Sequence, residues 1–166
     1  MPTLKLAHKE KCSLYTPHLT DAIFVAERIP VDEIRQVEAF TGIPYDAEQL
    51  ALWFHGTQFK IACQDSTSPI ALCGFSSVGP GVYRTFFLAT EYAWSEHGKE
   101  LTHLTRSGMQ EIIAREGIRR LETLCLASRK RAQTWYKMLG LVYESTLKSY
   151  ASNGEDAVMF TYIAEK

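Results

Sequence analysis

The sequence predicts an α/β fold in which helices flank both faces of a mixed, mostly antiparallel sheet. Two stretches have the pattern of antiparallel hairpins, one before and one after a long helical segment, and shorter helical segments fill much of the rest. Such an order predicts a layered α/β architecture. A doubly wound dinucleotide-binding sheet fits less well, because the chain has no G-x-G-x-x-G turn after a strand.

Length and composition indicate how many domains the chain forms and which classes of partner to expect. The chain has 166 residues, 46% hydrophobic and 22% charged, with a net charge of −1. This length predicts one globular domain over residues 1–166. The near-neutral charge gives no reason to expect nucleic acid or an anionic membrane as a partner. No apolar run has the length of a signal core or a bilayer span, so we expect a cytoplasmic protein.

The cysteines lack the spacing of a metal site. There is no C-x-x-C pair and no histidine at zinc-finger spacing among Cys12, Cys63, Cys73 and Cys125. Cys63, Cys73 and Cys125 lie in apolar, strand-like runs, where cysteine acts as a small buried hydrophobe in a reducing compartment. We therefore expect no metal.

The first part of the chain is predicted to be largely helical. Apolar residues at helical spacing continue up to Pro30 and resume after it, Gly42 forms a C-terminal stop, and Asp46 is the N-cap of a third helix. The predicted elements are weak strands over Thr3–Leu6 and Lys11–Tyr15 and helices over His18–Arg28, Val31–Phe40 and Asp46–Trp53.

The remainder alternates strands and helices. A polar turn at Asp65–Pro69 joins the first two strands into a hairpin, Gly117 and Gly140 end helices, and Asn153-Gly154 marks the last hairpin. The predicted elements are strands over Phe59–Gln64, Ile70–Ser76 and Val82–Ala89, a helix over Ser95–Glu116, a strand over Arg119–Leu126, a helix over Lys130–Leu139, and strands over Leu141–Tyr150 and Ala157–Ile163.

One segment resembles a family signature. Residues 129–141 read Arg-Lys-Arg-Ala-Gln-Thr-Trp-Tyr-Lys-Met-Leu-Gly-Leu, which resembles the Asn-x-x-Ala-x-x-x-Tyr-x-x-x-Gly-Phe signature of GNAT N-acetyltransferases. Ala132, Tyr136 and Gly140 are in register, whereas Arg129 replaces Asn and Leu141 replaces Phe. With its flanking strands, the stretch from residue 118 to 163 resembles the closing half of that fold, and the order of elements extends the resemblance to most of the chain.

The front half resembles a second group more loosely. Asp32-Glu33-Ile34, Ala39-Phe40-Thr41-Gly42 and Pro69-Ile70-Ala71-Leu72-Cys73-Gly74 look like small GNAT-like proteins of tailed phages, some of which are internal virion or head-assembly proteins. That resemblance implies an alternative: a catalytically silent phage structural or assembly protein that does not bind CoA and has virion components as partners. A small interaction module that uses the fold only as a scaffold is a third hypothesis.

The family resemblance implies transfer of an acetyl group from acetyl-CoA to an amine acceptor, either a small molecule or a protein. In this family a splayed strand holds the pantetheine arm through its backbone, and a turn at a helix N-terminus binds the pyrophosphate. The splayed strand maps onto Val82–Thr90, which otherwise reads as a core strand. The contacts implied by position are Phe86, Phe87, Leu88 and Ala89.

The pyrophosphate turn, Gln/Arg-x-x-Gly-x-Gly/Ala in the family, maps onto residues 95–101. His97, Gly98 and Lys99 are the implied cofactor contacts. Glu100 takes the second small-residue position, where we expect its charge to oppose phosphate binding. The alternative for this region is an ordinary helix start with Ser95 as N-cap.

Tyr136 holds the family's general-acid position, which implies proton donation to the CoA sulfur; the alternative is an aromatic that packs the helix onto the sheet. Ala132 and Arg129 are implied cofactor contacts, although Arg129 with its basic neighbours also reads as a solvated surface. Glu91, just after the central strand, is the best positional candidate for the general base. We expect the acceptor site around residues 31–53 and 150–156. Whether the chain forms a homodimer does not follow from the sequence.

Overall fold

One sheet runs through the part of the chain that the computed structural model describes, residues 11–165. Its strands lie in the order β1-β2-β3-β4-β5-β7-β6, and every neighbouring pair is antiparallel except β4 and β5. The predicted mixed, mostly antiparallel sheet is therefore confirmed. The strands are β1 (Ser13–Tyr15), β2 (Phe59–Gln64), β3 (Pro69–Gly79), β4 (Val82–Ala89), β5 (Arg120–Leu126), β6 (Val142–Leu147) and β7 (Ala157–Ile163).

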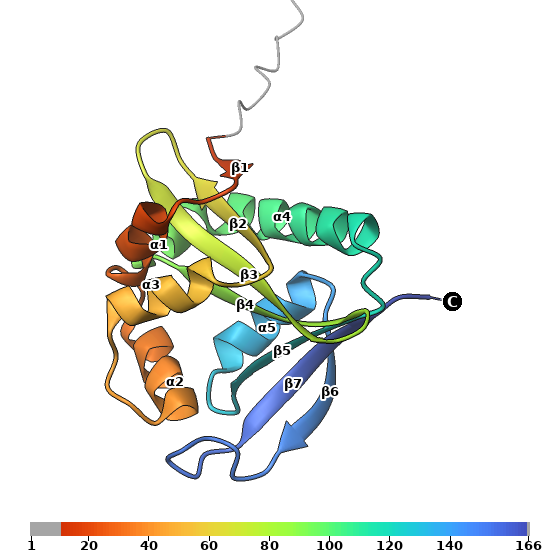
Figure 1. The fold of residues 1–166 in the computed structure, drawn as a ribbon. Helices are drawn as coiled ribbons and strands as arrows, with labels where there is room; N and C mark the ends of the chain where they lie inside the picture. The colour runs from red at the N-terminus through yellow and green to blue at the C-terminus, as the bar shows by residue number, and fades with distance from the viewer. Residues whose placement is uncertain (1–10, 166) are drawn as a thin grey trace, which may run out of the picture.

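Helices cover both faces of the sheet, as the sequence predicts. In Figure 1, α1 and α3 lie in front of β2–β4 and α4 lies behind them. On β3, Leu72 packs in the cluster of α1 and α3, while its neighbour Cys73 packs in the cluster of α4 and α5, because successive strand residues point to opposite faces. The helices are α1 (Leu19–Ala26), α2 (Val31–Thr41), α3 (Ala47–His55), α4 (Glu91–Arg115) and α5 (Lys130–Met138).

The long helix starts earlier than the sequence predicts. The hydroxyl of Thr90 accepts the N–H of Ala93 at 3.0 Å, which makes Thr90 the N-cap of α4. The prediction of Ser95 as the N-cap is wrong, because Ser95 lies within the first turns and donates to the carbonyl of Tyr92. The helix bends at His97, where φ is −130° and ψ is 15°.

Other local predictions can be compared directly. Asp46 caps α3 by accepting the N–H of Gln49 at 2.9 Å, as expected. The last hairpin is longer than an Asn-Gly turn, since residues 148–156 connect β6 to β7, with Gly154 at φ +82°. The strand expected over Thr3–Leu6 lies outside the described residues. All four cysteines are buried free thiols.

The feature that shapes the site is an opening between β4 and β5. Their parallel ladder covers only Val82–Arg84 against Arg120–Glu122. Beyond it, β4 continues paired to β3 and β5 continues paired to β7. The two halves of the sheet therefore meet near the β3–β4 turn and separate toward α2 (Figure 1).

The ring of Phe86 on β4 packs closely against the backbone of Gly74 on β3, on the face of the sheet that α3 covers. Gly74 of β3 leaves room for Phe86, because a Cβ at Gly74 would lie 2.4 Å from that ring. Phe86 also contacts Phe54, which is buried, and Trp53, which is 54% exposed and stacks on Phe86 with ring centroids 4.4 Å apart. The adjacent aromatics of α3 thus divide between core and surface.

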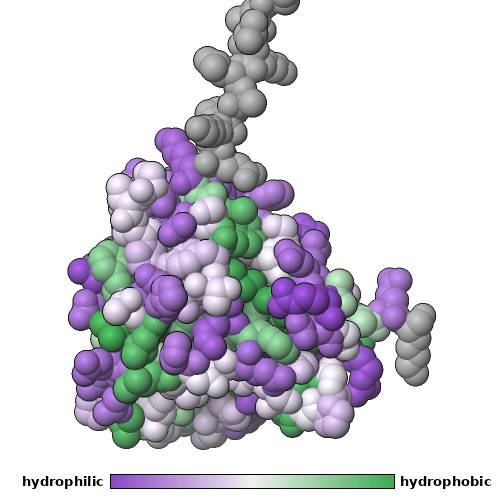
Figure 2. Space-filling model, turned by 45° about the horizontal axis from the view of Figure 1, so that its top comes forward, coloured by the Kyte–Doolittle hydropathy of each residue, from purple (hydrophilic) through white to green (hydrophobic). Residues whose placement is uncertain are grey.

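The surface is mixed in polarity. On the face shown in Figure 2, apolar residues form separate patches between hydrophilic ones. Among the helices of residues 11–165, none is both long enough and apolar enough to cross a bilayer.

Candidate active site

Tyr136 stands across the β4–β5 opening. It is only 5% exposed, and its ring packs against Phe87 of β4 (centroids 5.9 Å apart) and Phe160 of β7 (5.6 Å). The side chain of Thr123 on β5 lies close to its hydroxyl. Burial raises the pKa of Tyr136, with a further contribution from the nearby Cys125 thiol. The phenol therefore keeps its proton at neutral pH.

Arg129 joins the start of α5 to α2. Its side chain is 11% exposed, and Nη2 lies 2.7 Å from Glu33 Oε1 and 3.0 Å from Asp32 Oδ2. Burial raises the pKa of Glu33, and Arg129 opposes that rise. The solvated basic surface expected at Arg129 is wrong for this residue, because its guanidinium is buried between carboxylates; the neighbouring Lys130 and Arg131 are exposed.

The expected pyrophosphate turn lies at the bend of α4. His97 is buried with its ring between Asp65 and Glu100, so its side chain points away from solvent, whereas Lys99 is exposed. No atom lies within 4 Å of a Cβ built on Gly98. The carboxylate of Glu100, which we expect to oppose phosphate binding, accepts the N–H of Cys12 at 2.8 Å on the side of β1.

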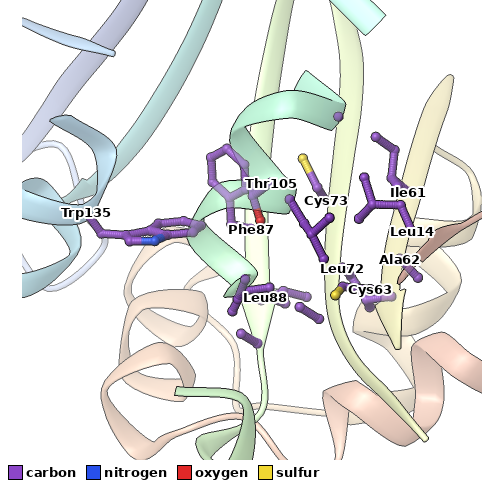
Figure 3. Close-up of a pocket in the computed structure, with 15 residues that line it drawn as sticks. Leu14, Ile61, Ala62, Cys63, Leu72, Cys73, Phe87, Leu88, Thr105 and Trp135 are labelled. Carbon is purple, nitrogen blue, oxygen red and sulfur yellow. The ribbon is translucent and has the colours of Figure 1, made fainter. Parts of the chain in front are cut away.

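The end of β4 carries the residues implied for pantetheine binding. Phe87, Leu88 and Ala89 line a small cavity of about 20 Å³ that also reaches Trp135 of α5. In Figure 3, Trp135 extends from α5 toward Phe87; the two ring centroids are 5.1 Å apart. The Trp135 Nε1 donates to the hydroxyl of Thr102 on α4 at 2.9 Å, so this indole links α5 to α4.

A wider cavity of about 690 Å³ lies on the side of α2. It is bounded by α2, the start of α5 and the β6–β7 connection, and its walls carry both charges. Its size falls within the range of ligand pockets in proteins. The lining includes Asp32, Glu38 and Glu155 among the acids and Arg35, Arg129, Lys130 and Arg131 among the bases. Ala132, an implied cofactor contact, lies at its edge.

Comparison with known proteins bears on the fold. A scan against protein-family models finds no match, and a search of curated proteins finds none either. Solved structures do match. The ribosomal-protein-S18-alanine N-acetyltransferase from Escherichia coli superposes with a TM-score of 0.69 at 16% identity, over 93% of this chain and 95% of that one. A GNAT-family acetyltransferase from Bacillus anthracis gives 0.71 at 9% identity, over 93% and 95%.

The microcin C7 self-immunity acetyltransferase MccE, in complex with acetyl-CoA and AMP, gives a TM-score of 0.71 at 13% identity over 94% of both chains. The chain has the GNAT fold. The fold predicted from the C-terminal segment is thus confirmed. These neighbours are described as acetyltransferases and lend no support to the phage relationship expected from the front half.

The GNAT fold brings only some of the expected site residues together. Tyr136 and Arg129 meet near the β4–β5 opening, through the shared neighbour Glu33, whose charge acts on both. Glu91 is exposed in the first turn of α4, and its role as base stays a prediction. Sequence reasoning missed Glu33, although a basic residue at a helix start, where a cation opposes the macrodipole, is a signal that an acidic partner lies nearby.

Proposed function

We propose that this protein is an N-acyltransferase that transfers the acetyl group of acetyl-CoA to an amine. The observation that carries the proposal is the position of Tyr136, a protonated phenol held between β4 and β5 where their ladder has ended. Solved neighbours of the same fold include one described as a complex with acetyl-CoA. They support the proposal but do not identify the acceptor amine.

Acetyl-CoA supplies a thioester, and the chain must bind it, orient it and manage two protons. Beyond Arg84 the edge of β4 has no ladder to β5, so backbone groups of Phe87 and its neighbours are the proposed contacts for the pantetheine amides. The space above Gly98 and the exposed ammonium of Lys99 are the proposed place for the phosphates.

Tyr136 is the proposed donor to the departing sulfur. Because its pKa is raised by burial, the hydroxyl is neutral and can donate a hydrogen bond to the thiolate as the thioester breaks. The Thr123 side chain orients that hydroxyl. The deprotonated amine attacks the carbonyl carbon, and the sulfur leaves as the thiol of CoA.

Glu33 is the proposed base for the amine. It is buried, its pKa is raised by that burial, and Arg129 fixes one of its oxygens. A carboxylate with a raised pKa is a stronger base than an ordinary exposed carboxylate. The acceptor would approach through the 690 Å³ cavity, whose lining carries both acidic and basic side chains.

Trp135 is expected to control entry of the acyl donor. The cavity beside Phe87 holds about one water molecule at most, so a pantetheine arm on the edge of β4 that also reached this side of Phe87 would require the indole to turn away from Thr102. Replacing it by the smaller leucine should tighten acetyl-CoA binding, measured by calorimetry. Unchanged or weaker binding of acetyl-CoA by Trp135→Leu would show that the indole is not an obstacle.

The test of the proposed reaction is release of the CoA thiol in the presence of a panel of primary amines and short peptides. Tyr136→Phe should lower kcat by about 100-fold or more with little change in acetyl-CoA affinity. Tyr143→Phe is the matched control, because that exposed hydroxyl contacts only Thr146 among the described residues. Equal turnover in both variants removes Tyr136 from the mechanism.

The base is tested by comparing Glu33→Gln with Glu91→Gln. If the substituted residue is the base, kcat/KM should fall and should no longer decrease at acidic pH. If its role is only structural, the melting temperature should fall and the pH dependence of kcat/KM should keep its shape. If Glu91→Gln changes the profile and Glu33→Gln does not, the original positional candidate is the base. The silent alternative predicts no acetyl-CoA binding at all.

A further inference from the structure

A cluster of potential metal ligands lies where the bend of α4 meets the chain next to β1. One ligand atom each from Cys12, His97 and Glu100 lie within 4.8 Å of one another. The strand register explains the meeting. Ser13 pairs with Gln64, so Cys12 and Asp65 are the next residues along the two strands, and alternation places Cys63 on their face as well. Buried residues of α4 pack on that face.

The bend of α4 directs His97 into this cluster. The non-helical backbone at His97 turns its ring toward β1 and β2, and Glu100, three residues later, lies on the same side of the helix. The ring is 8% exposed, and its Nε2 has no hydrogen-bond partner among residues 11–165. A buried imidazole nitrogen without a partner is costly, and a metal on Nδ1 would leave the proton on Nε2, where the carboxylate of Asp65 lies nearby.

The distances fit a metal ion better than direct hydrogen bonds. His97 Nδ1 lies 3.7 Å from Glu100 Oε2, and His97 Nε2 lies 3.7 Å from Asp65 Oδ2; both separations are too long for a hydrogen bond. Two ligand atoms that lie about 2.1 Å from a tetrahedral zinc ion are roughly 3.4 Å apart. A small contraction would bring Nδ1 and Oε2 to that separation.

We propose that Cys12, His97 and Glu100 bind a zinc ion that ties β1 to the bend of α4. Thiolate, imidazole and carboxylate together favour Zn²⁺ over Mg²⁺ or Ca²⁺, which prefer oxygen ligands alone. Cys63 lies on the same face of the sheet as Cys12 and is the nearest candidate for a fourth ligand, with water as the other. Spacing along the sequence could not indicate this site, because Cys12 is far in the chain from the residues of α4.

Asp65 provides the support that zinc-binding histidines usually have. A metal on Nδ1 leaves Nε2 as an N–H donor, and Asp65 Oδ2 is the nearby carboxylate that would accept it, as in carboxylate–histidine–zinc arrangements. The other oxygen of Asp65 is fixed by the N–H groups of Thr67 and Ser68, both at 2.8 Å. The carboxylate is therefore held in place before any metal binds.

The test uses the full chain, stripped with EDTA under a phosphine reductant and given Zn²⁺ alone. After desalting, wild type should retain one zinc per chain by mass spectrometry of metals and should melt at a higher temperature than the stripped protein. Cys12→Ala should lose zinc retention and the thermal shift. Asp65→Asn should bind zinc about 10- to 100-fold more weakly. Cys73→Ala, which replaces a buried cysteine in a different core cluster, is the control that should retain zinc.

A second measurement keeps the proposal testable if Cys12→Ala does not fold. Co²⁺ added to the stripped wild type should give a thiolate-to-cobalt charge-transfer band in the near ultraviolet and the strong visible bands of tetrahedral cobalt. Failure of the folded wild type to retain zinc would overturn the proposal and leave His97 as an ordinary partner of two carboxylates. A cobalt spectrum without the thiolate band, or equal zinc retention by Cys12→Ala, would overturn it as well. None of these outcomes depends on acetyl transfer.

Discussion

Replacing Arg129 by alanine should destabilise the protein strongly, and more at neutral than at acidic pH. The Glu33 carboxylate is 10% exposed and has Arg129 as its buried charged partner at 2.7 Å. Removing one partner of a buried ion pair typically costs about 3–5 kcal/mol, because the remaining charge is uncompensated. In a chain of this size, a loss of about 3 kcal/mol lowers the melting temperature by roughly 6–12 °C.

The pH dependence follows from the direction of the pKa shift. Burial already raises the pKa of Glu33, and Arg129 opposes that rise. In Arg129→Ala the opposition is gone, so the folded-state pKa rises further above the unfolded value. The folded state then binds more protons than the unfolded state, and stability falls as pH increases through that window. The loss of stability should therefore be smaller at pH 5 than at pH 8.

The assay is thermal unfolding followed by circular dichroism at pH 5 and pH 8. Lys148→Ala is the control, because its ion pair with Asp156 is exposed and its removal should leave the melting temperature unchanged. Replacing Arg129 and Glu33 together by leucine should cost less than Arg129→Ala alone, since no unpaired charge is left behind. A small loss that is equal at both pH values would refute the account of this pair.

Two further predictions concern backbone positions. Gly74→Ala should destabilise by about 1–3 kcal/mol because the new Cβ overlaps the ring of Phe86; Gly79→Ala, where no atom lies within 4 Å of a Cβ, is the control, and equal urea midpoints would contradict the close contact. Thr90→Ala should cost about 1 kcal/mol by removing the N-cap of α4, whereas Ser95→Ala should be near neutral; the reverse order would mean that the helix starts at Ser95.

The elements that could be predicted from the sequence are those with local causes. Apolar periodicity and the glycine stop at Gly140 define α5, and the side chain of Asp46 caps α3 within a single turn. The start of α4 was predicted too late because Thr90 and Ser95 are both good N-cap residues. The structure selects Thr90 because its N–H donates to the carbonyl of Ile70 on β3 at 2.9 Å, directly after β4 ends. This contact with another strand cannot be read from the local sequence.

The parts of the site that could not be predicted depend on distant contacts. Glu100 points toward the chain next to β1 because the N–H of Cys12 donates to its carboxylate. Arg129 stands at a helix start, where a cation is unfavourable, yet its partners Asp32 and Glu33 lie on α2. Only the fold brings these residues together, so neither the orientation of Glu100 nor the candidate base Glu33 follows from spacing.

The measurement that tests the central claim most directly is thermal unfolding with and without acetyl-CoA, supported by calorimetric titration. At about 100 times the dissociation constant, a ligand that binds only the folded state adds about 2.7 kcal/mol, which raises the melting temperature by roughly 5–10 °C. We predict a shift of this size in wild type and in Tyr136→Phe. No shift and no heat at millimolar acetyl-CoA would contradict the proposal that this GNAT fold is an acetyltransferase.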